Sequence, residues 1–323
     1  MKARIMATAV ALAGCFVLQP ARAAEYPDKT ITVVMPYAAG GATQALIERL
    51  SRTIQHDTGN AMIPDYRGGA GGTIAADMVA NARPDGYTLL MGSTGALAVG
   101  PAVMKVRFDP VKDFVPIALI ATTPYVMVVN SKLPIHTVKE LVEYAKANPG
   151  KLNFGSSSVG STDHIEWEVF QKMAGITSTH IPYKGMGPLL PDLISGRIDV
   201  AVMSPIPARP YIASGDFRPL GVTTKERSAS MKDVPTIAEQ GFPDYNMQAW
   251  YAFLAPAGTS PAMIDRLNKL TNKALRDKDM AEYLTTQGLT AGNGSPKEFA
   301  SFLRGELALW EAAVRSNGIV ASP

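Results

Sequence analysis

The feature that most constrains this chain is a repeated order of a short apolar strand, a glycine- or hydroxyl-rich turn and a helix. The clearest unit begins at residues 30–35, a β-branched run that ends at Pro36. It continues through Gly40 and Gly41 into helical apolar spacing over residues 42–56. Strands that alternate with helices of this length predict an α/β fold with mainly parallel sheets and helices on both faces.

The same order is predicted along most of the chain. Thr137 is expected to cap a helix, because Glu140 follows it at the spacing of a capping box. Further strands are predicted at residues 61–64, 87–91, 115–120, 125–129, 152–154, 179–181, 198–203, 217–222 and 249–255. Further helices are predicted at residues 74–81, 137–147, 163–173, 189–195, 261–276, 279–287 and 296–316.

The first 24 residues have the pattern of an export signal. Lys2 and Arg4 precede an apolar run at residues 5–18, and Ala21 and Ala23 have the spacing of a cleavage site. The apolar run is too short for a permanent membrane-spanning helix. We therefore expect cleavage near Ala23 and export to the periplasm.

Cys15 supports a second interpretation of this leader. Residues 12–15 also fit a lipobox, which would leave Cys15 as a lipidated N-terminus. The apolar residues 16–18 stand where a lipoprotein usually has a polar tether, so we favour ordinary cleavage. Because Cys15 is the only cysteine, the mature chain would have no disulfide, no catalytic thiolate and no Cys-ligated zinc.

Charge and length describe a near-neutral protein with room for two lobes. The chain has 31 basic and 28 acidic residues, and without Lys2, Arg4 and Arg22 the counts are equal. This balance gives no indication of nucleic-acid binding. The remaining length of about 300 residues suits two lobes. We expect residues 25–122 plus 222–323 to form lobe one and residues 123–221 lobe two, with crossings near residues 122–124 and 221–224.

Four stretches follow predicted strands, where open parallel sheets bind ligands. Residues 36–44 combine glycines with a helix start at Thr43, and residues 92–95 offer the hydroxyls of Ser93 and Thr94. The turn at residues 182–185 and the strand end at Ser204 form another candidate. Each of these stretches also has an interpretation without a ligand: a tight turn or a helix cap for the loops, and a solvent-exposed side chain for Lys184.

The most distinctive stretch is residues 155–164, in which hydroxyl and glycine residues lead into a helix. Neutral donors at a helix N-terminus can bind a carboxylate without lysine or arginine. This stretch therefore predicts a carboxylate site. His164 is interpreted as a donor at the helix start rather than as a catalytic base, because no orienting partner for a base is evident.

Enzyme motifs are not matched. Val159 stands where a nucleophile elbow needs its second glycine. The glycine-rich turn at residues 68–72 lacks a following Gly-Lys-Ser/Thr, and Ile74 replaces the last glycine of a dinucleotide motif. The four histidines, at positions 56, 136, 164 and 180, are dispersed without metal-ligand spacing. We predict no enzyme activity, no cofactor and no metal.

Short motifs in a specific order resemble the substrate-binding receptors of tripartite tricarboxylate transporters, also called the Bordetella uptake gene family. The resemblance implies a type II periplasmic-binding-protein fold, with a hinge and Venus-flytrap closure. It also implies that both lobes hold a ligand carboxylate, often through bridging waters on the lobe-one side. The motifs are residues 26–27, 35–36 with 40–41, 66–72, 84–90, 108–110 with 112–114, 149–154, 160–161 with His164, 182–185, 233–236 and 254–259.

The resemblance, combined with the four stretches, gives the predicted ligand contacts. Those of lobe one are Tyr37, Ala39, Gly41, Ala42, Thr43, Ser93 and Thr94. Those of lobe two are Ser157, Ser158, Ser161, Thr162, His164, Lys184, Gly185, Met203 and Ser204.

Two departures from the family pattern narrow the expected ligand. The family often has acids where this chain has Gln44 and Met203, and Met203 offers a soft apolar surface instead. We therefore expect an aromatic or aliphatic mono- or dicarboxylate with a substantial apolar body, terephthalate among them. The expected partners are this small acid and the subunits of an inner-membrane permease, with the receptor as a monomer. A receptor that signals to a membrane kinase without transport is the alternative.

Overall fold

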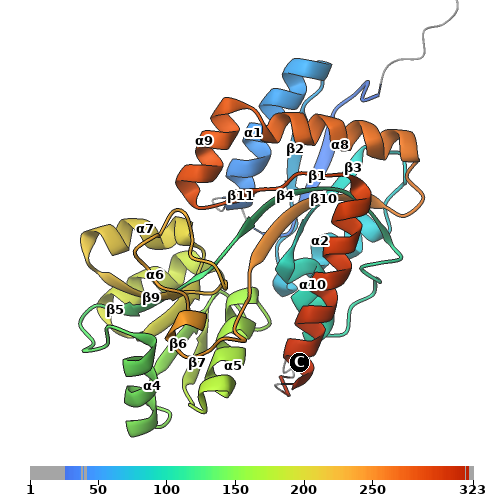
Figure 1. Cartoon of the computed structure of the whole chain (residues 1–323). Coiled ribbons are helices and arrows are strands. Elements are labelled where there is room, and N and C mark those ends of the chain that lie inside the picture. Colours follow the sequence, from blue (N-terminus) through green and yellow to red (C-terminus); the bar gives the residue numbers. More distant parts are fainter. Residues whose placement is uncertain (1–25, 38, 40–41, 317, 320–323) are drawn as a thin grey trace, which may run out of the picture.

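The computed structural model describes residues 26–37, 39, 42–316 and 318–319. The predicted export signal, Cys15 and Gly41 lie outside these residues. The chain forms two lobes, each built on one sheet with helices packed against it (Figure 1). We call the lobe of the six-stranded sheet the first lobe and the lobe of the five-stranded sheet the second lobe.

The first sheet has the strand order β11-β4-β10-β3-β1-β2. Its strands are β1 (Ile31–Met35), β2 (Met62–Tyr66), β3 (Thr88–Ser93), β4 (Phe114–Thr123), β10 (Ala249–Pro256) and β11 (Thr290–Ala291). Its helical segments are α1 (Ala42–Thr58), η1 (Ala70–Gly72), α2 (Thr73–Ala80), the π-helical η2 (Gly95–Val99), α3 (Gly100–Val103), α8 (Pro261–Leu275), α9 (Lys278–Gln287) and α10 (Pro296–Ser316).

The second sheet has the strand order β7-β6-β8-β5-β9. Its strands are β5 (Val126–Asn130), β6 (Asn153–Ser156), β7 (Thr179–Pro182), β8 (Val200–Met203) and β9 (Phe217–Val222). Its helices are α4 (Val138–Ala147), α5 (Thr162–Ala174), α6 (Met186–Ser195) and α7 (Pro205–Ser214), and the short η3 (Ala238–Gln240) lies in the segment that leads back to the first sheet.

The predicted α/β class is confirmed, and both sheets are mixed, with most strands of each sheet running in one direction. Strands β1, β2 and β3 pair in parallel, as do β6, β7 and β8. The antiparallel pairings all involve β4 and β10 in the first sheet or β5 in the second. These three strands adjoin the crossings between the lobes. An apolar run shows that a strand is buried, but not in which direction it runs.

The chain changes sheet twice. The first change falls between β4 and β5, within the predicted crossing. After β9, however, the chain stays with the second lobe: Val222 N donates to Pro235 O at 3.0 Å, and Ile237 N donates to Val222 O at 2.9 Å. Met231 and Val234 join the second lobe's core. We therefore propose that residues 223–247 move with the second lobe, and the predicted lobe boundaries stay a prediction.

Helix α7 is not among the predicted elements, because residues 205–214 contain three prolines. Pro205 occupies the first helical position, and Pro207 lies in the first turn, where backbone N–H groups lack intrahelical acceptors anyway. Only Pro210 interrupts the helix interior. The helix is stabilised by packing, since Ala208 is buried in the core of the second lobe.

The predicted cap of α4 is present with one difference. The Thr137 hydroxyl accepts a hydrogen bond from Glu140 N at 3.1 Å. The Glu140 carboxylate accepts from His136 N, not from the cap residue itself.

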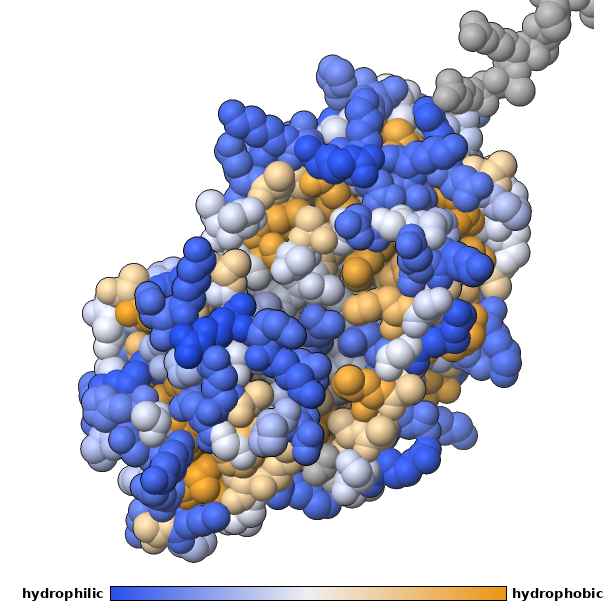
Figure 2. Space-filling view, viewed as in Figure 1, coloured by the Kyte–Doolittle hydropathy of each residue, from blue (hydrophilic) through white to orange (hydrophobic). Residues whose placement is uncertain are grey.

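The surface is predominantly polar on the outer edges of both lobes. In the space-filling view, apolar residues gather on the upper lobe and toward the junction between the lobes (Figure 2). Within the described part of the chain, no helix has the length and hydropathy needed to span a membrane.

Gly305 in the middle of α10 provides a stability prediction. It is exposed, and a Cβ atom added there would have no neighbouring atom within 4 Å. Glycine in a helix interior is less favourable than alanine by about 1 kcal/mol. Gly305→Ala should therefore raise the free energy of unfolding by about 0.5 to 1 kcal/mol in urea titrations. Unchanged or lowered stability would show that this turn of α10 is not helical in solution.

Candidate functional site

The start of α5 lies where the two lobes meet. Ser161 is the N-cap residue with extended backbone angles, so Thr162 and Asp163 form the first turn. Backbone N–H groups in a first turn have no intrahelical acceptor. Thr162 is 5% exposed and Asp163 is 3% exposed. These polar residues are therefore covered, although they stand at a helix end.

Backbone segments of the first lobe provide part of this cover. A Cβ atom built on Gly95 would lie 3.4 Å from the Thr162 hydroxyl oxygen. One built on Gly71 would lie 3.4 Å from Gly160 O. Segments η1 and η2 thus lie so near the start of α5 that an added Cβ atom would be in van der Waals contact with it. The lobes are therefore in contact around the start of α5.

Tyr37, Ser93 and Thr94 are brought together on the first-lobe side. The hydroxyls of Tyr37 and Ser93 are 2.9 Å apart, and Ser93 Oγ also accepts from Ala96 N at 3.3 Å. Thr94 Oγ1 accepts from Trp250 N at 2.7 Å. Burial of its hydroxyl raises the pKa of Tyr37 to about 12. Tyr37 therefore stays protonated at neutral pH and remains able to donate.

Ser157 is engaged by a carboxylate of the same chain. Ser157 N donates to Asp163 Oδ2 and Ser157 Oγ to Asp163 Oδ1, each at 2.6 Å. Burial raises the pKa of Asp163, while the bonds from Ser157 oppose this shift. The backbone N–H and the hydroxyl of Ser157, which were predicted to bind the ligand, thus already donate to Asp163. The sequence interpretation missed this role, although an acid in a first helical turn is favoured by the helix dipole.

The remaining loop residues divide into a structural pair and an available hydroxyl. Ser161 Oγ donates to Ser158 O at 2.7 Å and accepts from Ser158 N at 3.3 Å, which fixes the turn. Among the described residues, none forms a hydrogen bond with the Thr162 hydroxyl. Thr162 and the first-turn amides are the donors that this loop leaves for a ligand.

One ring nitrogen of His164 acts as an acceptor in the loop before α5, and ligand contact by His164 stays a prediction. Its Nδ1 accepts a hydrogen bond from Gly160 N at 3.1 Å. Its ring stacks on His180 at a centroid distance of 4.1 Å, and His180 in turn stacks on Phe154. Burial, aided by the neighbouring His180, lowers the pKa of His164 to about 4. His164 is thus neutral: its Nδ1 accepts from the loop, and its Nε2 lies 3.7 Å from Glu168 Oε1.

The other predicted second-lobe contacts have different environments. Lys184 is exposed, and Gly185 N donates to Ser157 O at 2.8 Å. Met203 is fully buried in the core of the second lobe. Ser204 precedes α7 without capping it, and its buried hydroxyl has no hydrogen-bond partner in the part of the chain that is described. Ser204 is thus an available donor, whereas ligand contact by Lys184 and Met203 stays a prediction.

The predicted loop at the start of α1 is only partly described. Thr43 is 3% exposed in the first turn of α1, and Ala39 is exposed. Ala42 begins the helix. Gly41 lies outside the described residues. Contact of these four residues with a ligand stays a prediction.

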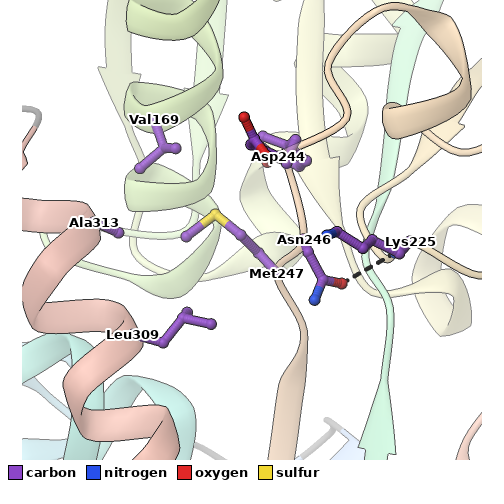
Figure 3. A pocket seen from close by; sticks show the side chains of 8 residues that line it. Val169, Lys225, Asp244, Asn246, Met247, Leu309 and Ala313 are labelled. Atoms are coloured by element: carbon purple, nitrogen blue, oxygen red, sulfur yellow. Dashed lines mark hydrogen bonds between the residues drawn. The ribbon is translucent and has the colours of Figure 1, made fainter.

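A separate groove of about 270 Å³ lies away from these donors. Figure 3 shows Val169 of α5 and Leu309 and Ala313 of α10 around it, with the segment that contains Asp244 and Met247 between them. Lys225 N donates to Asn246 Oδ1 at 3.0 Å on its far side. The groove lies beside the segment that connects the lobes.

Within the described residues, no cluster of three or more His, Cys, Asp or Glu side chains is arranged to hold a metal ion. The donors at the start of α5 are hydroxyls and amides, which suit an organic anion rather than a metal.

Comparisons with known proteins agree with this geometry. Residues 47–319 match the family described as the tripartite tricarboxylate transporter family receptor. Protein BugT of Bordetella pertussis is 35% identical over 311 residues, covering 96% of this chain and 95% of that protein. A structure described as R. palustris Rpa4515 with adipate has a TM-score of 0.86 and 34% identity, covering 92% of this chain and 99% of that one. MatC of Rhodopseudomonas palustris, solved with bound malate, has a TM-score of 0.83 and 29% identity, covering 90% of this chain and 100% of that one.

Proposed function

Because the chain belongs to the tripartite tricarboxylate transporter receptor family, we propose that it captures a small organic carboxylate between its two lobes and delivers it to a membrane permease. The proposal places the receptor in the periplasm after cleavage of residues 1–24. It acts as a monomer and performs no chemistry on its ligand.

The observation that carries this proposal is the covered start of α5. A helix N-terminus concentrates unpaired N–H groups and the positive end of the helix dipole. Thr162 stands there beneath Gly95 of the first lobe. A complete donor set exists only when the lobes meet, so the closed state binds a carboxylate better than the open state. That difference in affinity is what drives closure.

The proposed ligand has one carboxylate at α5 and a substantial apolar body. Gln44 and Met203 stand where the family often has acids. The solved relatives with adipate and malate bind aliphatic dicarboxylates. An aromatic or aliphatic mono- or dicarboxylate fits both observations. Calorimetry that finds tight binding of glutamate and none of aromatic or aliphatic acids would reject this ligand class.

Thr162→Val tests the position of the carboxylate. Valine keeps the shape of threonine but removes the hydroxyl, and a hydrogen bond to a charged group contributes about 1.5 to 3 kcal/mol. We expect affinity for the best-binding acid to fall by about tenfold to a hundredfold. A thermal-shift screen of organic acids on the mature protein identifies that acid, since a ligand at about 100 times its Kd adds about 2.7 kcal/mol.

Thr179→Val is the matched control. Thr179 lies in β7 of the same lobe, and its hydroxyl donates to Gly150 O at 2.8 Å on the exposed surface. This variant should bind the acid as the wild type does. Equal binding by Thr162→Val and the wild type would place the carboxylate elsewhere.

A further inference from the structure

Glu166 is a fully buried acid without a hydrogen-bond donor. It lies one turn after Asp163 in α5 and is 0% exposed. Neither of its carboxylate oxygens has a hydrogen-bond partner in the described part of the chain. An ionised carboxylate in such a place would lose its hydration without compensation, which costs several kcal/mol. Burial of Glu166 therefore requires either a positively charged partner or protonation of its carboxylate.

The groups around Glu166 come from both lobes. Asp163 precedes it on α5, Glu306 faces it from α10, and Tyr125 and Tyr245 lie near it at the connections between the lobes. The Tyr245 hydroxyl donates to the backbone oxygen of Glu166, at 3.0 Å, and not to its carboxyl group. Among the described residues, the charged groups that act on Glu166 are the carboxylates of Asp163 and Glu306, with no lysine or arginine. A basic partner is thus not the source of compensation.

Glu306, unlike Glu166, has hydrogen-bond donors that stabilise its ionised carboxylate. Its Oε2 accepts from Trp250 Nε1 at 3.1 Å and from Trp310 Nε1 at 3.3 Å. Hydrogen bonds to a carboxylate favour its charged form, whereas Glu166 has none. If one of the two carries a proton, it is therefore Glu166. Burial, with the charges of Asp163 and Glu306, raises the pKa of Glu166 well above its usual range.

Closure of the lobes creates this environment. Helix α5 packs on β6 and β8 of the second lobe, and α10 packs on β4 and η2 of the first. A single core cluster contains Ile165 and Val169 of α5 together with Leu303 and Trp310 of α10. Separation of the lobes would remove α10 and Glu306 from α5 and return water to this face of the helix.

We propose that Glu166 is a proton-binding site completed by lobe closure, so that each capture of a carboxylate ligand takes up one proton. The inference rests on the proposed function, because it assumes that the lobes close on an anion. The proton offsets the negative charge that the ligand adds beside Asp163. Closure is then favoured by acid and opposed by alkali.

The sign of the expected pH dependence follows from the two states. In the open state a solvated glutamate ionises near pH 4.3, and in the closed state the buried group holds its proton to higher pH. At pH values between the pKa of Glu166 in the open state and its pKa in the closed state, the closed state binds one proton more than the open state. The Kd for the ligand should therefore rise about tenfold for each unit of increasing pH across this range.

Calorimetric titration with adipate as the probe tests the proposal. Binding is measured near pH 7 in two buffers of different ionisation enthalpy, which gives the number of protons taken up. We expect close to one proton for the wild type and none for Glu166→Gln or Glu166→Met. The methionine variant is included in case Glu166→Gln does not fold, because an apolar side chain needs no hydrogen-bond partner in the buried site. Equal proton uptake by the wild type and both variants would overturn the inference, as would binding that depends on Na⁺ or K⁺ instead of pH.

Glu143→Gln is the control, since Glu143 is an exposed acid on α4 of the same lobe. It should keep the wild-type proton uptake. Adipate binding without proton uptake would refute the inference while supporting the proposed function.

A second measurement needs no ligand. Small-angle scattering should show the wild type more compact at pH 5 than at pH 8, because protonated Glu166 can be buried. Both Glu166 variants should be equally compact at the two pH values. The same pH response in the variants as in the wild type would refute proton binding at Glu166, whether or not adipate binds.

Discussion

Gly95→Val should weaken ligand capture by up to about a hundredfold. A Cβ atom at this position would lie 2.6 Å from Tyr37 Oη, 3.1 Å from Gly71 O and 3.4 Å from Thr162 Oγ1. Tyr37 could swing away, but the Gly71 carbonyl belongs to the backbone. The contacts with Tyr37 and Gly71 lie within the first lobe and affect both the open and the closed state, whereas the valine methyl groups would meet Thr162 only when the lobes are closed. Overpacking at that contact costs about 1 to 3 kcal/mol. Calorimetry with the best-binding acid measures the loss, at up to about a hundredfold in Kd.

Gly187→Val provides the comparison. Gly187 lies in α6, and a Cβ atom there would have no neighbour within 4 Å. This variant should bind as the wild type does. Wild-type affinity in Gly95→Val would mean that the approach of η2 to α5 is not needed for binding.

His164→Asn should remove a large part of the acid sensitivity of the fold. The folded pKa of His164 is about 4, below the ordinary value of about 6.5. The unfolded chain therefore binds the additional proton, and stability falls as the pH decreases from about 6.5 to 4. This effect amounts to about 2 kcal/mol between pH 8 and pH 5. Asparagine keeps an acceptor near Gly160 N but does not titrate.

The measurement is the free energy of unfolding of both proteins in urea at pH 8 and pH 5. Buried Asp163 and Glu166 have raised pKa values, so they change stability in the opposite sense. The difference between wild type and variant isolates the histidine. We expect the wild type to lose about 2 kcal/mol more than the variant on acidification. Parallel losses would show that His164 is accessible to protons in the folded protein.

Much of the fold is predictable from local patterns. The strands ending at Met35 and Val222 and the helix capped by Thr137 follow from apolar period and cap chemistry, which act within a few residues. Strand direction is not local: β4, β5 and β10 are buried runs like the others, yet they pair antiparallel. Helix α7 was missed because tertiary packing outweighs the low helix propensity of its prolines.

The site shows the same division. That a donor-rich loop precedes α5 is evident from residues 155–164, and the structure buries Ser161 and Thr162 at the junction of the lobes. Which donors remain available depends on three-dimensional partners. Asp163 engages Ser157, and Gly160 N donates to His164. Sequence spacing gives no information about such competition, because hydroxyls that bind a ligand and hydroxyls that shape a turn look alike.

Hydrogen exchange of the mature protein, with and without the best-binding acid, tests the central claim most directly. If the lobes close on a carboxylate at α5, exchange should slow at the first-turn amides of Thr162 to His164 and in η2 around Gly95. Residues on the outer faces, such as those of α4, should exchange as before. Protection confined to the groove around Val169, Asp244 and Leu309, or unchanged exchange at the start of α5 despite bound acid, would contradict the account.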